Sequence, residues 1–391
     1  MVIRPLHLAL SARRSIVVEC LVFSSMWCSC TALSAADAPR IVTKETIAQA
    51  LEARQRKLQR VMFSWTEQRT EKKGWKANGL PGAPDQIRPA TDLAYSQDNS
   101  LSFDAERVRF EYRRSNWRFD DDYEGPRATI GVFDGKVDKS FYPPPDLLGF
   151  PRGNTSSRWS FSYDAYIQPF LWACRPLETS LLKDLRKWQL SARRGSFDGR
   201  ECVVLEYVER AVLLREIWLD PMLDYALVRR MDYNEEKRLT FQCDVRYRSA
   251  MQERVFLPSS WKIVVLRSGS PIVRVNGELK EYTIDPEFAA TQFTLDYPVG
   301  TRVIDETGEG YVEYIVRPDG SRRNVLPEEW VDAEPGHPEQ WTEIYEHIRD
   351  TEPPDERSSL WGWPVAVVVG AILILAIFVG WRKLNRVRTA L

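Results

Sequence analysis

Histidine is nearly absent from this chain of 391 residues, which contains three: His7, His337 and His347. No histidine occurs between residues 37 and 330. Catalytic Ser–His–Asp or Cys–His groups and zinc sites of the HExxH type all need this residue. The sequence therefore excludes such sites from that segment, and we expect the protein not to be an enzyme.

Cysteine is also scarce, with six residues in the chain, and no CxxC pair occurs. This absence excludes a thioredoxin-like redox site and a zinc knuckle. Beyond residue 36 there are three cysteines: Cys174, Cys202 and Cys243. Cys202 and Cys243 both fall in runs typical of strands, so they either form a disulfide or remain buried thiols.

The chain also lacks the signatures of nucleotide, nucleic-acid and calcium sites. It has no Gly-rich phosphate loop and no alternation of strands and helices. The net charge is −1 without a basic stripe, which argues against a nucleic acid partner. The acidic residues at 120–124 do not have the spacing of a calcium loop. We therefore expect no cofactor and no metal site.

One long apolar run stands near the C-terminus, at residues 359–381. As a helix, a run of this length spans roughly 30 Å, which is about the thickness of a bilayer core. Aromatic residues mark its ends and basic residues follow it, as expected at membrane interfaces. The alternative is a buried core helix, but such helices rarely lack a polar face. The predicted interface residues are Trp361, Trp363, Trp381, Arg382 and Lys383.

The charges around this predicted span indicate its orientation. Residues 327–356 are rich in Asp and Glu, whereas the tail at 382–391 is basic, so the C-terminus is expected in the cytoplasm. Residues 1–36 have two arginines, an apolar run and small residues near Ala36, which is typical of a signal peptide. An uncleaved anchor is the alternative. We predict a single-pass type I protein of the cell inner membrane, with its main body in the periplasm.

Between these ends the pattern is that of an α+β protein with mainly β structure. A helix is expected over Thr43–Arg60, and two more over 163–173 and 176–190. About ten strands joined by short turns indicate a large antiparallel sheet. Asp-Gly pairs at 134–135 and 198–199 predict hairpins. We assign a β-rich domain to residues 37–316 and an acidic juxtamembrane stalk to residues 317–358.

Several strand phrases resemble one family. They are "FDAERVRFEY", "FDGKV", "REIWLDPMLDYALVRRMDY", "DVRYRSAMQERVFLPSSW" and "FTLDYPVGTRVIDE". Together, over about Thr43–Glu306, they resemble the outer-membrane lipoprotein carrier (LolA-like) superfamily and its RseB-like relatives among periplasmic stress regulators. The resemblance implies a strongly curved antiparallel sheet, an incomplete barrel, covered by a few helices and able to hold acyl chains. The carriers are soluble, whereas this chain has a predicted membrane span. A protein held in a membrane cannot cross the periplasm, so the span argues against a shuttling role.

The expected ligand is a lipid or lipoprotein acyl chain held by aromatic residues in the concavity of the sheet. An ordinary packed core is the alternative explanation of these aromatics. A second hypothesis is a sensor or scaffold that acts on another envelope protein at the membrane. A third is a histidine-independent hydrolase that uses paired carboxylates. The residues predicted to line the apolar cavity are Phe110, Tyr112, Phe133, Phe141, Trp218 and Trp261.

Overall fold

The computed structural model describes most of the central part of the chain. The chain divides into two units, Met1–Val42 and Thr43–Leu391, and all elements below belong to the second. The predicted leader (1–36), span (359–381) and basic tail (382–391), with the interface residues Trp361, Trp363, Trp381, Arg382 and Lys383, lie outside the described residues. In the described part, no helix has both the length and the apolarity needed to cross a membrane. The described residues are 42–74, 91–118, 124–144, 150–157, 167–179, 181–250, 255–326, 329 and 338–351.

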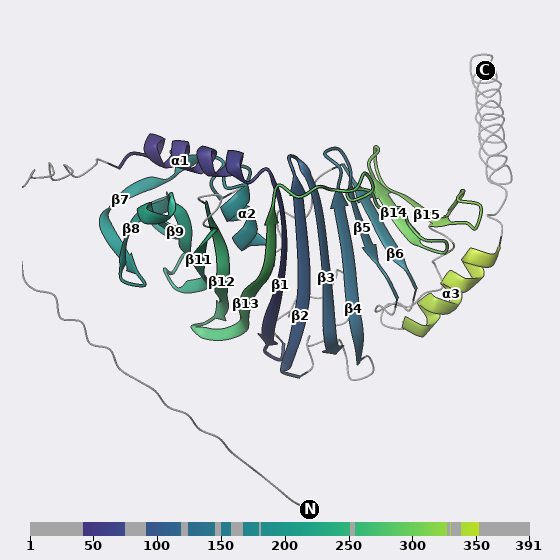
Figure 1. Cartoon of the computed structure of the whole chain (residues 1–391). Coiled ribbons are helices and arrows are strands. Elements are labelled where there is room, and N and C mark those ends of the chain that lie inside the picture. Colours follow the sequence, from purple (N-terminus) through teal and green to yellow (C-terminus); the bar gives the residue numbers. More distant parts are fainter. Residues whose placement is uncertain are drawn as a thin grey trace, which may run out of the picture. The chain divides into compact units, whose positions relative to one another are not determined.

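Sixteen strands of the described ranges form one sheet, whose order is β16-β15-β14-β6-β5-β4-β3-β2-β1-β13-β12-β11-β10-β9-β8-β7 (Figure 1). All neighbouring strands are antiparallel except β6 and β14, which are parallel. The predicted antiparallel sheet is confirmed, with more strands than expected. The strands are β1 (Arg60–Glu71), β2 (Leu93–Asp104), β3 (Arg107–Arg118), β4 (Glu124–Phe133), β5 (Asp138–Tyr142), β6 (Arg152–Ser156), β7 (Gln189–Phe197), β8 (Arg200–Glu209), β9 (Val212–Asp220), β10 (Ala226–Tyr233), β11 (Leu239–Ala250), β12 (Val255–Arg267), β13 (Ser270–Ile284), β14 (Arg302–Glu306), β15 (Val312–Val316) and β16 (Arg322–Asn324).

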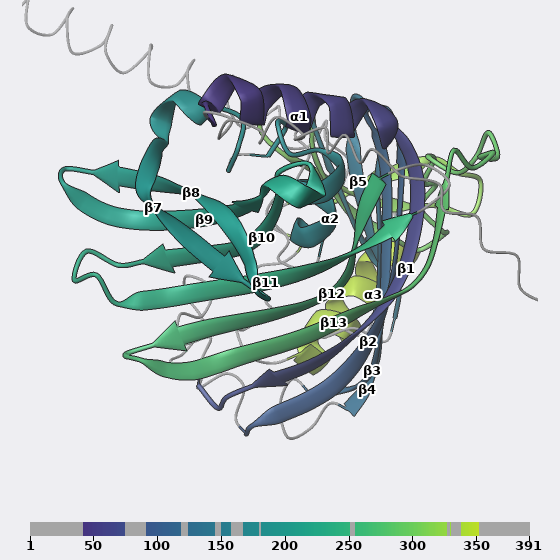
Figure 2. The same ribbon diagram turned by 60° about the vertical axis from the view of Figure 1, so that its left-hand side comes forward.

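The sheet is strongly curved and remains open, because its first and last strands do not pair (Figure 2). Register shifts interrupt several ladders, for example at Ser64/Trp65 between β1 and β13 and at Arg246/Tyr247 between β11 and β12. Such bulges add to the natural twist of strands and bend a sheet. The hairpin predicted at 198–199 is confirmed: Asp198 and Gly199 both have positive φ, 48° and 78°, as a type I′ turn requires.

Helices cover the inner face of the curve. The helices are α1 (Lys44–Lys57), α2 (Gln168–Cys174) and α3 (Pro338–Asp350), with 3-10 turns η2 (Leu185–Lys187) and η3 (Pro221–Leu223). α1 begins at the N-cap Thr43, whose hydroxyl accepts from the Thr46 N–H. Figure 2 shows α1 across the rim of the sheet and α2 inside the curve. We call the face that carries α2 the inner face and the opposite face the outer face.

The helix predicted over 176–190 is wrong, since this segment forms turns and η2. Its side chains compete with a helical backbone: the Thr179 hydroxyl donates to the Pro176 carbonyl, and Asp184 accepts from the Arg186 N–H. Short polar side chains commonly favour turns in this way. The helix predicted over 163–173 is described from Gln168 onward, where it forms α2.

The segment 285–301, which we call the strap, crosses the outer face and carries the chain from β13 to β14 (Figure 1). Arg109 on β3 donates to the carbonyls of Gln292 and Thr294, and Lys139 on β5 donates to that of Leu295. Apolar side chains of the strap pack on Val132 and Phe141 of the sheet. The outer face of β3–β5 is therefore covered by the chain itself.

The predicted acidic stalk is not separate from the sheet where it is described. β16 pairs with β15, and α3 packs Tyr345 and Ile348 against Phe150 and Ile315. The buried guanidinium of Arg323 binds the carboxylate of Glu329 and the carbonyl of Thr351 at the end of α3. The β-rich domain therefore extends beyond residue 316, to Thr351 in the described part.

The buried side chain of Arg175, at the C-cap of α2, holds three segments together. Its guanidinium donates to the carbonyls of Leu58 (2.7 Å) and Gln59 (2.8 Å) after α1 and to that of Ala105 (2.9 Å) between β2 and β3. Only 2% of Arg175 is exposed. Buried carbonyls that lose a charged donor are costly, because neither water nor another donor replaces it.

We therefore predict that Arg175→Met lowers the free energy of unfolding by about 3 kcal/mol or more. The matched control is Arg238→Met, in an exposed turn, which should change it by less than about 0.5 kcal/mol. Urea unfolding of the full chain, followed by tryptophan fluorescence, measures both. Equal stability of the two variants would show that Arg175 does not hold these segments.

Candidate functional site

The inner face of β1–β3 is divided into an apolar half and a polar half. Along β1, alternate residues point inward and are buried, as expected from the two-residue period of a strand. The first three of these are Val61, Phe63 and Trp65, and the next three are Glu67, Arg69 and Glu71. The same change from apolar to polar occurs on β2 and β3, so it runs across three strands.

The apolar half is filled by α2. The ring of Phe170 lies 4.6 Å from that of Phe63, 4.5 Å from that of Trp65 and 5.1 Å from that of Trp261, measured between centroids. All four side chains are buried, and the distances are those of favourable aromatic pairs. In the described structure this half of the concavity is packed with protein side chains.

The polar half contains a network of buried charged and polar groups, which we call the polar cluster. Glu71 Oε1 accepts from Arg69 Nε and from the Tyr95 hydroxyl, both at 2.7 Å. The guanidinium of Arg114 donates to Gln97 Oε1 at 2.8 Å and lies over the ring of Tyr112. The members of the polar cluster are Glu67, Arg69, Glu71, Tyr95, Gln97, Asn99, Tyr112 and Arg114.

A hydrogen bond from the Trp65 indole N–H to Glu67 Oε1, at 3.2 Å, joins the two halves. Buried charges cost free energy even when they are paired, so replacement by apolar residues is often neutral or stabilising. A cluster of four charged side chains inside a sheet is therefore a candidate site for binding. Its carboxylates, guanidinium groups and hydroxyls can accept and donate hydrogen bonds to the polar end of a ligand.

The polar cluster consists of carboxylates, guanidinium groups, side-chain amides and phenol hydroxyls. No histidine, serine or cysteine belongs to the polar cluster, and within the described ranges no three His, Cys, Asp or Glu side chains are placed to hold a metal ion. Glu67 and Glu71 are engaged by Trp65 and by Arg69 with Tyr95. The geometry thus offers hydrogen bonds and charge next to an apolar surface.

Four of the six predicted cavity aromatics lie on the inner face. Phe110 and Tyr112 are buried there. The ring centroid of Phe110 lies 6.0 Å from that of Trp65. Trp261 belongs to the group around Phe170. Phe133 pairs with Val108, which shares the face of Phe110. Whether any of them contacts a ligand stays a prediction.

The other two aromatics were placed on the wrong face. Phe141 packs against Phe293 and Leu295 of the strap, on the outer face. Trp218 pairs with Arg229, whose guanidinium lies 4.9 Å from its ring, and its neighbours Ile217 and Leu219 take the buried inner positions. Both are separated from the polar cluster by the sheet itself.

The polar cluster was missed by reasoning from sequence, although a signal was present. In "FSWTEQRTE", Glu67, Arg69 and Glu71 continue the alternation that begins with Phe63 and Trp65. Charged residues at alternate positions usually face water, which is why they were not assigned to the inside. These three charged residues stand at the same alternate positions as the two aromatics, and this spacing indicates that they share the inner face.

Trp261 has its place because the neighbouring strand carries a glycine. Gly277 pairs directly with Trp261, and a Cβ on it would lie 2.0 Å from Trp261 Cε2. The indole lies flat over this bare stretch of backbone and reaches Phe170.

We predict that Gly277→Ala displaces the indole and lowers the free energy of unfolding by about 1–3 kcal/mol, the usual cost of overpacking.

The matched control is Gly308→Ala, because a Cβ there meets nothing within 4 Å. Urea unfolding gives the stability of both variants, and near-ultraviolet circular dichroism reports the displaced indole. An unchanged near-ultraviolet spectrum in Gly277→Ala would contradict the prediction.

The disulfide between Cys202 and Cys243 is not formed, and Cys174 is free as well. Cys202 lies on β8 and Cys243 on β11, with β9 and β10 between them. Three strand spacings amount to about 14 Å, twice the largest Cα separation that a disulfide allows. Burial raises the pKa of the Cys174 thiol to about 12 and that of Cys202 to about 11, and it also raises that of Cys243.

These thiols are therefore protonated and inaccessible at neutral pH, and the thiolate is the reactive form. We predict that iodoacetamide at pH 8 leaves Cys174, Cys202 and Cys243 unmodified in the folded chain. All three should react after denaturation without any reductant. Peptide mass spectrometry reads both states, and a Cys202–Cys243 peptide linked by sulfur would refute the prediction.

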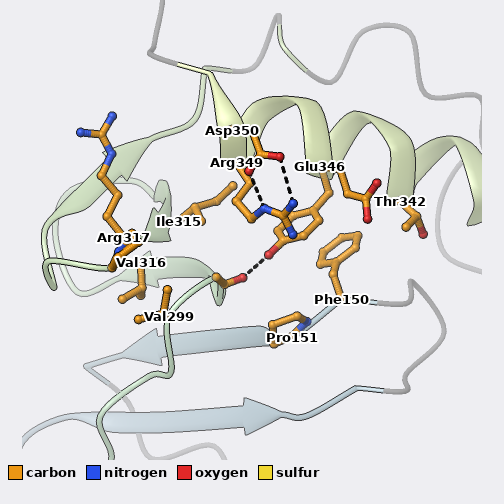
Figure 3. A pocket seen from close by; sticks show the side chains of 13 residues that line it. Phe150, Pro151, Val299, Ile315, Val316, Arg317, Thr342, Glu346, Arg349 and Asp350 are labelled. Carbon is orange, nitrogen blue, oxygen red and sulfur yellow. Dashed lines mark hydrogen bonds and ion pairs between the residues drawn. The ribbon is translucent and has the colours of Figure 1, made fainter.

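Apart from the inner face of β1–β3, a hollow lies between α3, the turn at Gly300 and β15 (Figure 3). Its volume is about 590 Å³. The Tyr345 ring stacks on Phe150 at 4.3 Å between centroids, and its hydroxyl donates to the Gly300 carbonyl. Arg349 is paired with Asp350. This hollow is lined by apolar side chains, such as those of Val299 and Ile315, together with charged ones, such as those of Arg317 and Glu346.

No protein-family model matches this chain, and no curated protein matches it in sequence. Several solved structures are similar in architecture. A domain described as an outer membrane lipoprotein-sorting protein from Vibrio parahaemolyticus is 12% identical, covering 63% of this chain and 94% of its own, with a TM-score of 0.37. A LolA superfamily protein from Nitrosomonas europaea is 13% identical, covering 65% and 99%, with a TM-score of 0.36.

Both comparisons concern the fold alone. The MucA/MucB complex of Pseudomonas aeruginosa is also similar, at 10% identity, covering 62% of this chain and 98% of its own, with a TM-score of 0.21. One neighbour is described as a LolA superfamily protein, and this is the family that the strand phrases resemble. With TM-scores below 0.5, the similarity transfers no activity to this chain.

Proposed function

We propose that this protein is a non-catalytic binding protein of the cell envelope that holds the acyl chain of a lipid or lipoprotein on the inner face of its sheet. The division of the inner face carries this proposal: an apolar half against α2 adjoins the buried polar cluster. An amphiphilic ligand matches such a surface, with its tail against Phe63, Trp65 and Trp261. Its polar end meets Glu67 and the groups beyond it.

In this proposal α2 occupies the acyl site when no ligand is bound. The helix has seven residues, and those from Pro169 to Cys174 are all buried. Arg175 holds its C-terminal end, while a hydrogen bond from Arg230 to Gln168 Oε1, at 3.2 Å, holds the other. An acyl chain gains about 0.8 kcal/mol per buried CH₂. Ten methylenes thus offer roughly 8 kcal/mol, enough to replace the contacts of a few α2 side chains.

We further propose that the protein is anchored in the cell inner membrane as a single-pass type I protein, with the β-rich domain in the periplasm. The support is the apolar run at 359–381 and the charges on its two sides. α3 is docked on the sheet and ends at Asp350. The residues from there to the span could extend at most about 30 Å, so the domain would work close to the membrane surface.

An alternative is a sensor or scaffold that acts on another membrane protein. The hollow beside α3 favours it, because its mixed lining of apolar and charged side chains suits a peptide segment (Figure 3). The end strands β7 and β16 favour it as well, since each has one unpaired edge in the described sheet. Such edges can receive an added strand from a partner.

Photo-crosslinking tests the acyl-chain site in the full chain within membranes. We expect a palmitic acid analogue with a terminal diazirine to label peptides of β1 or α2. Phe170→Ala removes the ring that fills the apolar half, so it should raise this labelling severalfold. The control Phe141→Ala makes the same change on the outer face and should leave the labelling unaltered.

The position of the label decides between the two proposed functions. Label on β1 or α2 that responds to Phe170→Ala supports the acyl-chain site. Label found solely within residues 359–381, as for any protein in contact with lipid tails, would reject the acyl-chain site and leave the scaffold.

A further inference from the structure

A hollow of about 510 Å³ lies beside η2, where β8 and β9 meet the segment before β7. We call it the basic pocket. Tyr207 and Arg215 pair with each other across β8 and β9, and Arg215 pairs with Asp232 on β10. The alternation of these strands puts all three on the inner face, the side that also carries α2. The basic pocket thus opens on the concave side, away from the polar cluster on β1–β3.

The walls of the basic pocket are fixed by hydrogen bonds and ring contacts. The Trp188 indole N–H donates to the Leu181 carbonyl at 2.9 Å, and its ring lies 5.8 Å from that of Tyr207 between centroids. Lys44 of α1 donates to the Trp188 carbonyl at 3.2 Å. Trp188 is buried. A ligand would therefore meet a preformed aromatic floor.

Positive charge dominates the lining. Lys183, Arg186, Lys187 and Arg215 surround the hollow, against one carboxylate, that of Asp184. Asp184 is engaged by Arg186, at 3.0 Å. Among the residues that the structure describes, the ion pair of Asp184 is with Arg186, whereas Lys183 and Lys187 form none; Lys187 lies near enough to contribute to the lowered pKa of Asp184. These two ammonium groups leave the basic pocket with a net positive charge that its own side chains do not neutralise.

The guanidinium of Arg215 is held in place by Asp232, and one of its nitrogens, Nη1, can donate to a ligand. Its Nε and Nη2 donate to the two carboxylate oxygens of Asp232, at 2.7 and 3.2 Å. This bidentate pair fixes the plane of the guanidinium, and Nη1 has no hydrogen-bond partner among the residues that the structure describes. Arg230 also binds Asp232, through Nε at 2.9 Å and Nη2 at 2.5 Å. Asp232 is thus already shared by two arginines, which reduces its ability to neutralise Arg215.

We propose that the basic pocket binds a phosphate group through Lys183, Lys187 and Nη1 of Arg215. A phosphate has three terminal oxygens and up to two charges, and it suits several separate donors, whereas one carboxylate is satisfied by a single arginine. Lysine is a common phosphate ligand that acts as a point charge. The phosphate belongs either to a lipid headgroup or to a soluble phosphate compound. This site stands independently of the acyl-chain site.

Protection of lysines from acetylation tests the site in the full chain, reconstituted in phosphatidylcholine vesicles. Three additions are compared: phosphatidic acid in the vesicles, soluble pyrophosphate, and citrate as an anion without phosphate. Peptide mass spectrometry measures the acetylation of Lys183 and Lys187 relative to Lys237, which lies in an exposed turn. We expect phosphatidic acid, pyrophosphate or both to protect Lys183 and Lys187, and citrate to protect them much less.

Arg215→Gln provides the matched variant, because Asp232 keeps Arg230 as its partner and no carboxylate is left unpaired. Loss of one charge-assisted hydrogen bond should raise the ligand concentration for half-protection about tenfold. Arg238→Gln removes the same charge from an exposed turn and should leave it unchanged. Protection by phosphatidic acid alone identifies a lipid phosphate, and protection by pyrophosphate alone identifies a soluble one. No protection in either arm, equal protection by citrate, or an unchanged Arg215→Gln variant would overturn the proposal.

Discussion

The guanidinium of Arg175 is the contact on which the arrangement of the inner face depends. It connects the end of α1, the turn between β2 and β3, and the end of α2 through the carbonyl oxygens of Leu58, Gln59 and Ala105. A curved sheet has a concave side that must be filled. Here Arg175 fixes the C-terminal end of the short helix that fills it, and Arg230 holds the other end. The aromatic contacts of Phe170 follow from that position.

The same helix marks the boundary between two kinds of interior. On its side of the boundary, ring packs against ring, and removal from water supplies the stabilisation. Beyond Trp65 the interior consists of paired charges, which contribute little net stability. A protein selected for stability alone would gain little from such pairs. Their presence beside a packed aromatic surface is the physical basis for regarding the inner face as a binding surface and not merely a core.

Local features of the fold could be predicted from the sequence, whereas long-range ones could not. The helix after Thr43, the turn at Asp198-Gly199 and the alternation of β3 depend on neighbouring residues, and each was predicted. The parallel pairing of β14 with β6 depends on the strap, and no short pattern specifies it. Trp218 was assigned to the wrong face because its strand, β9, is buried at consecutive positions, Glu216 with Ile217 and Leu219 with Asp220. Such a strand has no alternation from which to read its phase.

The order of the strands has a consequence for how the chain folds. β1 lies at the centre of the sheet, and its partner β13 is far later in the sequence. Because Val61 pairs with Ile284, the ladder of β1 cannot form until β13 has been synthesised. Pairing between strands so far apart in the sequence closes a large loop and makes folding slow. Until β13 arrives, the edge of β1 with Phe63 and Trp65 is exposed to other chains. Chaperones that hold the chain unfolded until this pairing can form would therefore limit its aggregation more than an increase in final stability.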